Sequence, residues 1–237
     1  MVKNIIFDLG GVLMWLNPDE AMRRFESLGI TDAREQMNIF GQTGLFLLLE
    51  NGTISADEFC HMLAKEAQTK GGRFPDEENP AFTYDEMQWA WKGYIKEVPQ
   101  HLLDYILTLK DKYRLCLLSN TNPFLQDWVR SDDFSKAGQP LTHYLDDLFC
   151  SYELNDYKPA LSIFEKALKQ GNIKAEESIF LDDSQRNIEA AEKVGLHGLL
   201  VGKDEDWREA LNRNYQNLTK YEENIICYRL HADIDRM

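Results

Sequence analysis

The sequence predicts an α/β fold in which a doubly wound parallel sheet is interrupted by an inserted α-helical segment. Two observations carry this prediction: short apolar runs recur along the chain, and amphipathic helical patterns lie between them. The expected strands are residues 5–7, 115–118, 148–150, 178–181 and 198–201. Strands that alternate with helices in this way form a parallel sheet that helices cover on both faces.

The segments between these runs carry apolar residues at spacings of three and four, which gives each expected helix one apolar face. The three patterns are Leu102, Ile106 and Leu109, then Leu161, Phe164 and Leu168, then Ile188, Ala191 and Val194. Pro159 suits the first turn of the second helix, and Gly171 and Gly195 suit the ends of the second and third.

The segment from about residue 15 to residue 97 differs from the rest, because it shows several helix starts and no convincing strand. The capping-box spacing, in which two helix-end residues satisfy each other's free amides, occurs at Asp32 with Glu35, Ser55 with Glu58, and Thr83 with Glu86. Asn51-Gly52 indicates a turn, and residues 70–80 a polar loop. We therefore expect a core of residues 1–15 and 98–203 with a helical insertion at 16–97.

Residues 204–237 follow the last expected strand as a C-terminal extension. Trp207, Leu211, Tyr215 and Leu218 have helical spacing, so this extension is expected to pack on the core or on a partner subunit. The pattern fits either surface and leaves the oligomeric state open.

Composition limits the possible functions. The 237 residues can form one large domain with an insertion, and the net charge of −14 argues against nucleic acid as a partner, since nucleic-acid binders present a basic surface. The four cysteines are far apart, which favours reduced thiols, and the scattered histidines give no support to a zinc site. No signal peptide is evident, and no apolar run approaches the roughly 18 residues of a membrane span. We expect a cytoplasmic protein with no membrane partner.

Polar residues stand at the end of each of the main strands. They are Asp8, then Ser119 and Asn120, then Lys158, and finally Asp182 and Asp183 followed by Ser184 and Asn187. Because ligands bind beyond the carboxyl ends of parallel strands, these groups are expected to share one site. Each has a simpler explanation by itself, such as a turn residue or a helix cap, and it is the ordered set that points to a functional site.

The chemistry of this set suits phosphoryl transfer. Carboxylates in contact repel one another by roughly 1 to 4 kcal/mol per pair, and Mg²⁺ relieves this repulsion by taking a few carboxylate oxygens together with phosphate. Lys158 could balance the remaining charge and hold a phosphoryl oxygen, and Ser119 could donate a hydrogen bond to another. Asp8 is then the expected nucleophile, which forms an aspartyl-phosphate that water hydrolyses.

Four segments of the chain, FDLGGV, LLSNTN, YKPA and FLDDSQRN, resemble the four ordered motifs of the haloacid dehalogenase-like (HAD) hydrolase superfamily. The resemblance spans roughly residues 3–202 and implies a Rossmann-like core, with the insertion as a cap of the subfamily I type. The implied roles are Asp8 as nucleophile and magnesium ligand, Ser119 and Asn120 as phosphate contacts, Lys158 as the group that orients nucleophile and phosphate, Asp183 as a magnesium ligand, and Asp182 as a ligand directly or through water.

Gly10 departs from the motif, because phosphatases of this superfamily usually have Asp at that position. Gly10 keeps the backbone carbonyl that the family offers to the metal, but it has no side chain for the proton transfer. That transfer is typically worth about 10² to 10⁴ in rate. Bacterial members similar to sugar-1-phosphate phosphatases also carry Gly here, so the resemblance still implies hydrolysis.

The expected function is therefore a Mg²⁺-dependent phosphatase for a small phosphorylated metabolite such as a sugar phosphate. One alternative is a phosphometabolite-binding protein with little or no catalysis, which Gly10 and the extension motivate. A second is a 2-haloacid dehalogenase, although such a metal-free site gains little from Asp182 and Asp183. A phosphomutase is disfavoured, because protonation of the sugar hydroxyl normally needs the acid that Gly10 lacks.

Overall fold

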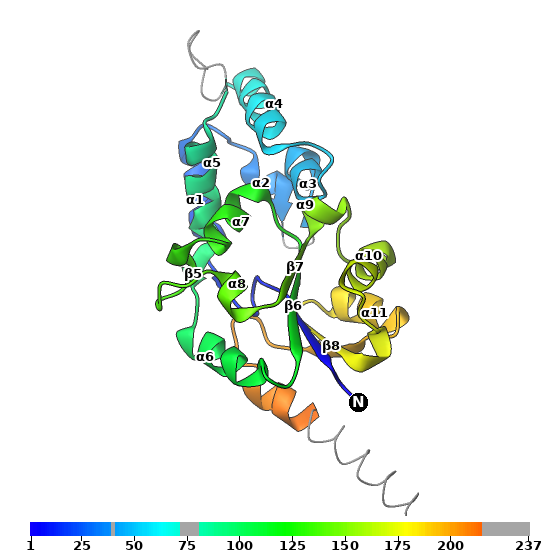
Figure 1. Ribbon diagram of the computed structural model, residues 1–237. Helices are drawn as coiled ribbons and strands as arrows, with labels where there is room; N and C mark the ends of the chain where they lie inside the picture. Colours follow the sequence, from blue (N-terminus) through cyan, green and yellow to red (C-terminus); the bar gives the residue numbers. More distant parts are fainter. Residues whose placement is uncertain (39–40, 72–80, 215–237) are drawn as a thin grey trace, which may run out of the picture.

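The computed structural model describes residues 1–38, 41–71 and 81–214. Its centre is a five-stranded sheet of order β7-β6-β1-β8-β9, in which every pairing is parallel (Figure 1). The strands are β1 (Asn4–Phe7), β6 (Arg114–Ser119), β7 (Asp147–Cys150), β8 (Ser178–Asp182) and β9 (His197–Leu200). All five predicted strands are confirmed, with bounds that differ by at most one residue at either end.

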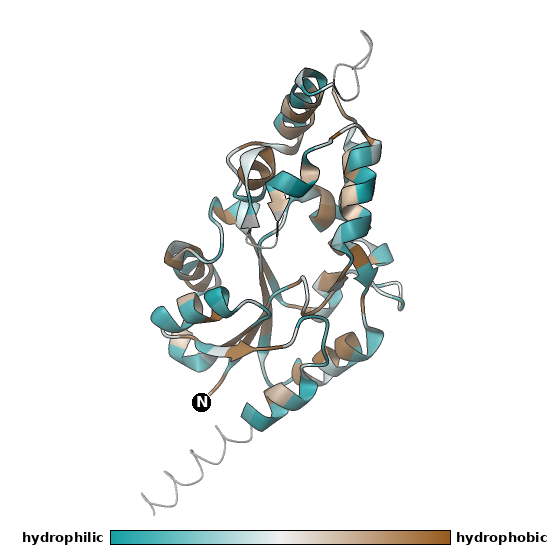
Figure 2. Ribbon diagram, turned by 180° about the vertical axis from the view of Figure 1, so that it is seen from behind, coloured by the Kyte–Doolittle hydropathy of each residue, from teal (hydrophilic) through white to brown (hydrophobic). Residues whose placement is uncertain are grey.

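Successive residues of β1 face opposite sides of the sheet, as the pleat requires. Ile5 and Phe7 belong to one apolar cluster, which includes residues of α6, and Ile6 belongs to a second, which includes residues of α10 and α11. Helices therefore cover both faces of the sheet, and Figure 2 shows apolar strands between helices with hydrophilic outer faces. The helices of the core are α6 (Gln100–Leu109), α7 (Pro123–Val129), α8 (Leu141–Tyr144), α9 (Ser151–Leu154), α10 (Leu161–Gly171) and α11 (Gln185–Lys193).

The predicted helix ends are correct in one case and displaced in two. Gly195, at φ +91°, ends α11 as expected. The placement of Pro159 in the first turn of α10 is wrong, because Ala160 has an extended conformation and is the N-cap of a helix that begins at Leu161. Gly171 is the last residue of α10, and the left-handed residue that ends the helix is Asn172, at φ +49°.

The insertion packs around an apolar cluster of its own, which lies above the sheet in the orientation of Figure 1. Among the described residues, Phe124 of α7 is the one member of that cluster from outside the insertion. The elements of the insertion are β2 (Trp15–Leu16), α1 (Pro18–Ser27), α2 (Ala33–Gln36), β3 (Met37–Asn38), β4 (Gly41–Gln42), α3 (Gly44–Glu50), α4 (Ala56–Thr69), α5 (Tyr84–Trp91) and β5 (Ile95–Glu97).

The prediction that residues 15–97 contain no strand is wrong. Strands β2 and β5 pair antiparallel where the chain leaves and re-enters the core, and β3 and β4 form a second short pair. These strands have two or three residues, which is too short for an alternating apolar pattern to be visible in the sequence.

Two of the three predicted capping boxes are confirmed. Ser55 with Glu58 and Thr83 with Glu86 each make both reciprocal hydrogen bonds. The capping box at Asp32 is wrong, since its carboxylate caps no amide of α2 and instead accepts hydrogen bonds from the Gln36 side chain, at 2.7 Å, and from Lys70. The predicted turn at residues 51–52 is confirmed, and residues 72–80 of the predicted polar loop lie outside the described residues.

The first part of the C-terminal extension packs on the core. Trp207 is 1% exposed, its ring centroid lies 5.2 Å from that of Phe7 in β1, and its indole N–H donates to the Val12 carbonyl at 3.1 Å. Residues 208–214 are helical and bury Leu211, whereas Tyr215 and Leu218 lie outside the described residues.

Asp204 connects the extension to both strands at the base of the insertion. Its carboxylate accepts the backbone N–H of Leu16 in β2 at 3.1 Å and lies 3.7 Å from the ammonium of Lys96 in β5. Its own N–H donates to the Gly11 carbonyl at 2.9 Å. The sequence suggests a solvated helix start at this acidic stretch, whereas Asp204 acts as a cross-link between three segments.

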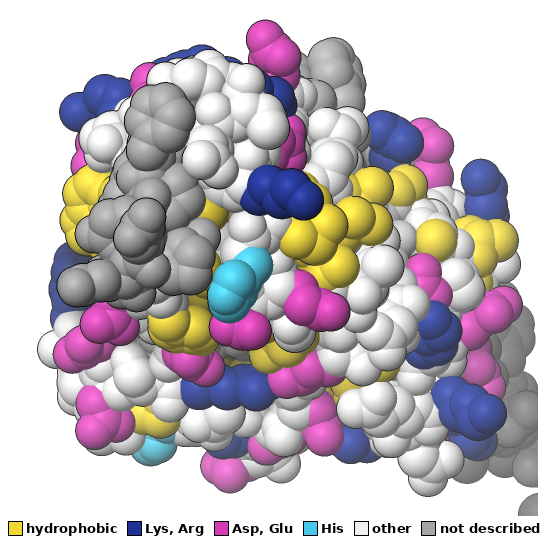
Figure 3. Space-filling view, turned by 90° about the horizontal axis from the view of Figure 1, so that it is seen from above, with side chains coloured by type: hydrophobic (Ala, Val, Ile, Leu, Met, Phe, Trp, Pro, Cys, Tyr) yellow, Lys and Arg dark blue, Asp and Glu magenta, His cyan; other side chains and the backbone are white. Residues whose placement is uncertain are grey.

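The charged side chains on the surface and the free thiols of the described cysteines agree with what the composition predicts. Figure 3 shows the face over the insertion, where acidic and basic side chains are interspersed with small apolar patches. Cys60, Cys116 and Cys150 are buried free thiols, and Cys227 lies outside the described residues. In the part of the chain that the structure describes, no helix has the length and hydrophobicity that a membrane span requires.

Trp207→Ala is expected to lower the free energy of unfolding by about 3 to 5 kcal/mol, because it removes a fully buried aromatic ring from the surface of β1. Trp89→Ala is the matched control, since Trp89 is 45% exposed and its described ring contact is with Arg24 at 5.1 Å. The control is expected to lose at most about 1 kcal/mol. Urea unfolding measures both values, and equal losses would contradict the packing described for Trp207.

Candidate active site

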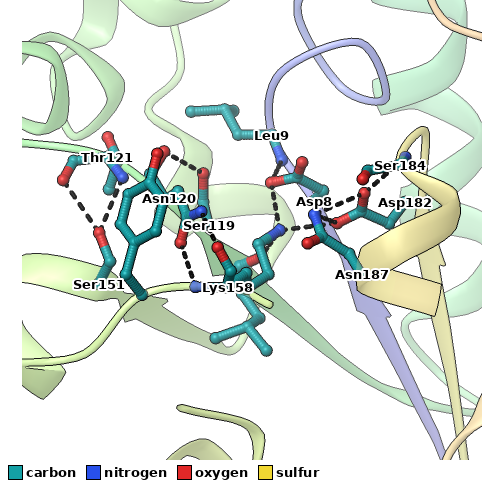
Figure 4. Close-up of polar contacts among 12 residues, drawn as sticks. Asp8, Leu9, Ser119, Asn120, Thr121, Ser151, Lys158, Asp182, Ser184 and Asn187 are labelled. Atoms are coloured by element: carbon teal, nitrogen blue, oxygen red, sulfur yellow. Dashed lines mark hydrogen bonds and ion pairs between the residues drawn. The ribbon is translucent and has the colours of Figure 1, made fainter. Parts of the chain in front are cut away.

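The sheet order places the candidate site at a topological switch point. Strand β1 lies between β6 and β8, and the chain runs outward from β1 in both directions. Crevices at such points, outside the carboxyl ends of parallel strands, are where ligands bind. Asp8 directly follows β1, Ser119 ends β6 and Asp182 ends β8, so the structure brings the predicted residues of three strands together (Figure 4).

Lys158 is the centre of this arrangement and is fully buried. Its ammonium lies 3.0 Å from Oδ1 of Asp8 and 2.7 Å from Oδ2 of Asp182, and it also donates to the Leu118 carbonyl at 2.9 Å (Figure 4). An ammonium has three hydrogens, so these three acceptors use its full donor capacity. Lys158 therefore fixes the positions of two carboxylates.

The two neighbouring aspartates of the fourth motif have different environments. Asp182 is 0% exposed, and besides Lys158 it accepts hydrogen bonds from the Ser184 N–H at 2.8 Å and from the Asn187 amide at 3.0 and 3.1 Å. Asp183 is half-buried and lines the cavity described below. A Cβ at residue 11 would lie 2.3 Å from Oδ2 of Asp183, so Gly11, which also has a φ of +76°, is required beside it.

Asp8, Asp182 and Asp183 can present oxygens to one ion. Three of their carboxylate oxygens, one from each residue, lie within 4.8 Å of one another. Three carboxylates against the single ammonium of Lys158 leave a formal charge of −2 in this group. A hard divalent cation with oxygen ligands, such as Mg²⁺, matches both the donor atoms and the charge.

The pKa values of the acidic groups in this site are raised, in keeping with the same shortage of positive charge. Burial raises the pKa of Asp8 to about 7; Asp182 and Asp183 act in the same direction, and Lys158 opposes them. Burial and the charge of Asp182 also raise the pKa of Asp183. Burial lowers the pKa of Lys158, but Asp182 and Asp8 outweigh that effect and raise it, which keeps the ammonium charged.

Ser119 and Asn120 lie at the same sheet edge and line the cavity. Both polar atoms of the Asn120 side chain bond the backbone of Lys158: Nδ2 donates to its carbonyl at 3.0 Å, and Oδ1 accepts its N–H at 2.8 Å. Asn120 therefore holds the loop that carries Lys158. A direct phosphate contact by Ser119 or Asn120 stays a prediction.

Gly10 lines the cavity beside an apolar side chain. A Cβ built on Gly10 would meet the side chain of Leu16, whose Cδ1 lies 3.3 Å away, and the three nearest atoms all belong to that residue. The position where the family usually has an acid is therefore bordered by a leucine from the base of the insertion.

A cavity of about 600 Å³ lies between the core and the insertion. Its core side includes Gly10, Ser119, Asn120, Thr121, Tyr157, Asp183, Ser184 and Lys203, and its insertion side includes Leu16, Pro18, Met37, Gln42, Glu50, Trp91 and Tyr94. Trp91 is thus both buried and cavity-lining, whereas Trp89, two residues earlier, is 45% exposed.

Sequence reasoning missed Glu50, which is 4% exposed and lines this cavity from the end of α3. Burial raises the pKa of Glu50 to about 7, against the opposing effect of hydrogen bonds from Asn122, Tyr157 and Gln42. One feature of the sequence could have identified Glu50, because this acid directly follows the apolar run of residues 45–49. A charged residue at the end of a buried helix is unusual when no partner for it lies nearby in the sequence.

Comparisons with known proteins agree with this geometry. The family model for haloacid dehalogenase-like hydrolases matches residues 2–195. The chain belongs to this family. It is similar to a D-ribitol-5-phosphate phosphatase of Bacteroides thetaiotaomicron, with 39% identity over 211 residues that cover 89% of this chain and 97% of that protein.

Two solved structures are also similar to this member of the family. One is a predicted HAD-like family hydrolase from Porphyromonas gingivalis, with a TM-score of 0.81, 35% identity, and coverage of 91% of this chain and 98% of that one. The other is a mutant HAD family enzyme of B. thetaiotaomicron in complex with magnesium and inorganic phosphate, with a TM-score of 0.77, 27% identity, and coverage of 89% and 99%.

Lys158→Met is expected to lower the free energy of unfolding by about 3 to 5 kcal/mol in EDTA, because it leaves two buried carboxylates without their cation. Lys166→Met is the matched control: Lys166 is 44% exposed and pairs with Asp156 at 2.8 Å, and surface pairs contribute at most about 1 kcal/mol. Urea unfolding compares the two, and a loss at Lys158 no larger than that of the control would contradict its buried role.

Glu50 is expected to make the stability of the protein depend on pH. Its folded pKa of about 7 is above the ordinary glutamate value of 4.5, so its contribution to stability is fully present below about pH 4.5 and is lost as the pH rises through 7. The stability of wild type relative to Glu50→Gln should therefore decrease by about 1 to 3 kcal/mol between pH 5 and pH 8. Urea unfolding of both proteins at several pH values measures this difference, and a constant difference would refute the assignment.

Proposed function

We propose that this protein is a Mg²⁺-dependent phosphatase that hydrolyses a small phosphorylated metabolite through an aspartyl-phosphate on Asp8. The observation that carries the proposal is the group of Asp8, Asp182 and Asp183 around the buried ammonium of Lys158, with its formal charge of −2. The similarity to a sugar-phosphate phosphatase and to a structure that holds magnesium and phosphate supports it.

In this proposal Asp8, Asp183 and the Gly10 carbonyl hold Mg²⁺, and Asp182 contributes directly or through water. The bound ion supplies positive charge that stabilises the phosphoryl oxygens during the reaction. Because Asp182 already accepts bonds from Lys158, Ser184 and Asn187, its main role is to position Lys158 and, through it, Asp8.

The reaction has two displacements at phosphorus. The carboxylate of Asp8 attacks phosphorus, a bond forms between that oxygen and phosphorus, and the ester bond to the leaving oxygen breaks. Water then attacks the phosphorus of the aspartyl-phosphate, the bond between phosphorus and the Asp8 oxygen breaks, and a proton of the water passes to solvent. Inorganic phosphate leaves and the Asp8 carboxylate is restored. Ser119 donates a hydrogen bond to a phosphoryl oxygen. The side chain nearest to Gly10 is Leu16, which carries no exchangeable proton, so we assign protonation of the leaving oxygen to water.

We further propose that residues 16–97 act as a cap that covers the substrate, with residues 1–15 and 98–203 as the hydrolase core. The separate apolar cluster of the insertion and the β2–β5 pair at its base support this division. A cap excludes bulk water during the reaction and contributes to substrate selection. The sugar or sugar-alcohol phosphates are the first substrates to test, because the relative at 39% identity is a D-ribitol-5-phosphate phosphatase.

Asp8→Asn is expected to reduce phosphate release from D-ribitol 5-phosphate and p-nitrophenyl phosphate by at least about 10³-fold, because an amide is not a competent nucleophile. EDTA should abolish wild-type turnover, and added Mg²⁺ should restore it. Asp111→Asn, the same substitution at an exposed turn residue of the core, is the control and should keep full activity.

Substantial turnover by a folded Asp8→Asn variant, or activity that survives EDTA on a 2-haloacid, would contradict the proposal. If the folded wild-type protein binds Mg²⁺ and a phosphorylated ligand without turnover, this result would instead support a binding protein. The absence of catalysis would then be explained by Gly10.

A further inference from the structure

Resting on the proposed function, we infer that Glu50 and Gln42 form a specificity pair that binds hydroxyl groups on the leaving group of the substrate. The ligand class is a polyhydroxylated phosphate monoester, with its phosphoryl group at Asp8 and its hydroxylated carbon chain at the insertion side of the cavity.

The two sides of the cavity differ in chemistry. The core side contains Asp183 and Ser119 next to the Asp8–Lys158 group, and the insertion side contains Glu50 and Gln42. A ligand that spans the cavity therefore meets a site for a metal and a phosphoryl group at one end and uncharged or acidic acceptors at the other. None of the cavity-lining residues named on the insertion side is a cation, so a phosphoryl group has no counter-charge there, which fixes the direction in which the ligand binds.

Glu50 is held in place by neutral hydrogen-bond donors, and no described cation forms an ion pair with its carboxylate. Its Oε1 accepts the Asn122 amide at 3.3 Å, and its Oε2 accepts the Tyr157 hydroxyl, also at 3.3 Å. The groups that act on it, Asn122, Tyr157 and Gln42, are all neutral. A carboxylate has about four lone-pair positions, and donors from these three residues leave one of them for a ligand.

Gln42 adds an acceptor that the described residues leave unused. The Gln42 side chain is a hydrogen-bonding neighbour that lowers the pKa of Glu50, and its own Oε1 is a buried atom with no hydrogen-bond partner among the described residues. An unsatisfied buried acceptor costs about 1 to 3 kcal/mol, which a ligand that brings a donor recovers.

Hydroxyl groups match this pair better than other uncharged groups. A hydroxyl both donates and accepts, so it can bond Glu50 as a carboxylate or as a carboxylic acid, and it can donate to Oε1 of Gln42. A ligand with an alkyl chain instead leaves Oε1 of Gln42 without a partner and the remaining lone pair of Glu50 without a donor. Sites built for hydroxyl groups reject analogues that lack them by large factors for this reason.

The experiment compares two monoesters with the same number of carbon atoms: a pentitol 5-phosphate, such as D-ribitol 5-phosphate, and n-pentyl phosphate, which has no hydroxyl groups. Wild type is expected to prefer the pentitol phosphate in kcat/KM. Glu50→Ala should lower kcat/KM for the pentitol phosphate by about 100-fold and change that for pentyl phosphate by no more than about threefold.

Two further variants refine the test. Glu50→Gln keeps an acceptor oxygen and should recover part of the loss, and Gln42→Leu, of similar size but without the carbonyl, should give a smaller loss in the same direction. Glu35→Ala, at an exposed acid in α2 of the same insertion, is the control and should leave both substrates unchanged. Urea unfolding verifies that each variant is folded.

Equal losses on both substrates would overturn the inference, since Glu50 would then act on the fold or on the chemical step. A wild-type preference for pentyl phosphate would overturn it while leaving the phosphatase proposal intact. If folded wild type hydrolyses neither ester, the proposed function fails. Calorimetric binding of the pentitol phosphate to the Mg²⁺-loaded protein then decides the inference. Binding that Glu50→Ala abolishes supports the inference, and no binding by wild type refutes it.

Discussion

A single buried ammonium determines how the rest of this site is built. Lys158 donates to two carboxylates and one carbonyl, and these acceptors come from the ends of three neighbouring strands. Buried charges of this kind are stable only when each finds a partner, so the loop that carries Lys158 must be held in register with β1, β6 and β8. Asn120 provides that register through two hydrogen bonds to the Lys158 backbone. The two formal negative charges that Lys158 leaves uncompensated match the divalent cation of the proposed mechanism.

Much of the core was predictable because its signals are local and strong. The strands are continuous apolar runs, and parallel pairing brings their carboxyl ends to one edge, so the meeting of Asp8, Ser119 and Asp182 follows from topology. The resemblance to the family implies different roles for Asp182 and Asp183, but no local pattern in the sequence indicates which of the two adjacent acids contacts Lys158. β8 ends at Asp182, whose carboxylate bonds Lys158, whereas Asp183 directly follows the strand and lines the cavity.

The insertion was predicted less completely, because its contacts are made by residues far apart in sequence. Glu50 has its hydrogen-bond partners at Asn122 and Tyr157, which lie 72 and 107 residues further along the chain. Asp32 has the spacing of a capping residue, but a tertiary contact with Lys70 competes for its carboxylate. The short strands β2 and β5 exist because each pairs with the other across the whole insertion, a contact that no local pattern encodes.

The cross-link at Asp204 has a consequence for how this protein can diversify. One carboxylate contacts both the strand that leaves the core and the strand that returns to it, so the two connections between core and insertion are linked at one residue. The side-chain and carbonyl partners of the Lys158 ammonium all come from the core, so side chains of the insertion can change without removing any of those partners. Descendants of such a chain could acquire a new substrate by altering the insertion alone, while inheriting the same chemistry.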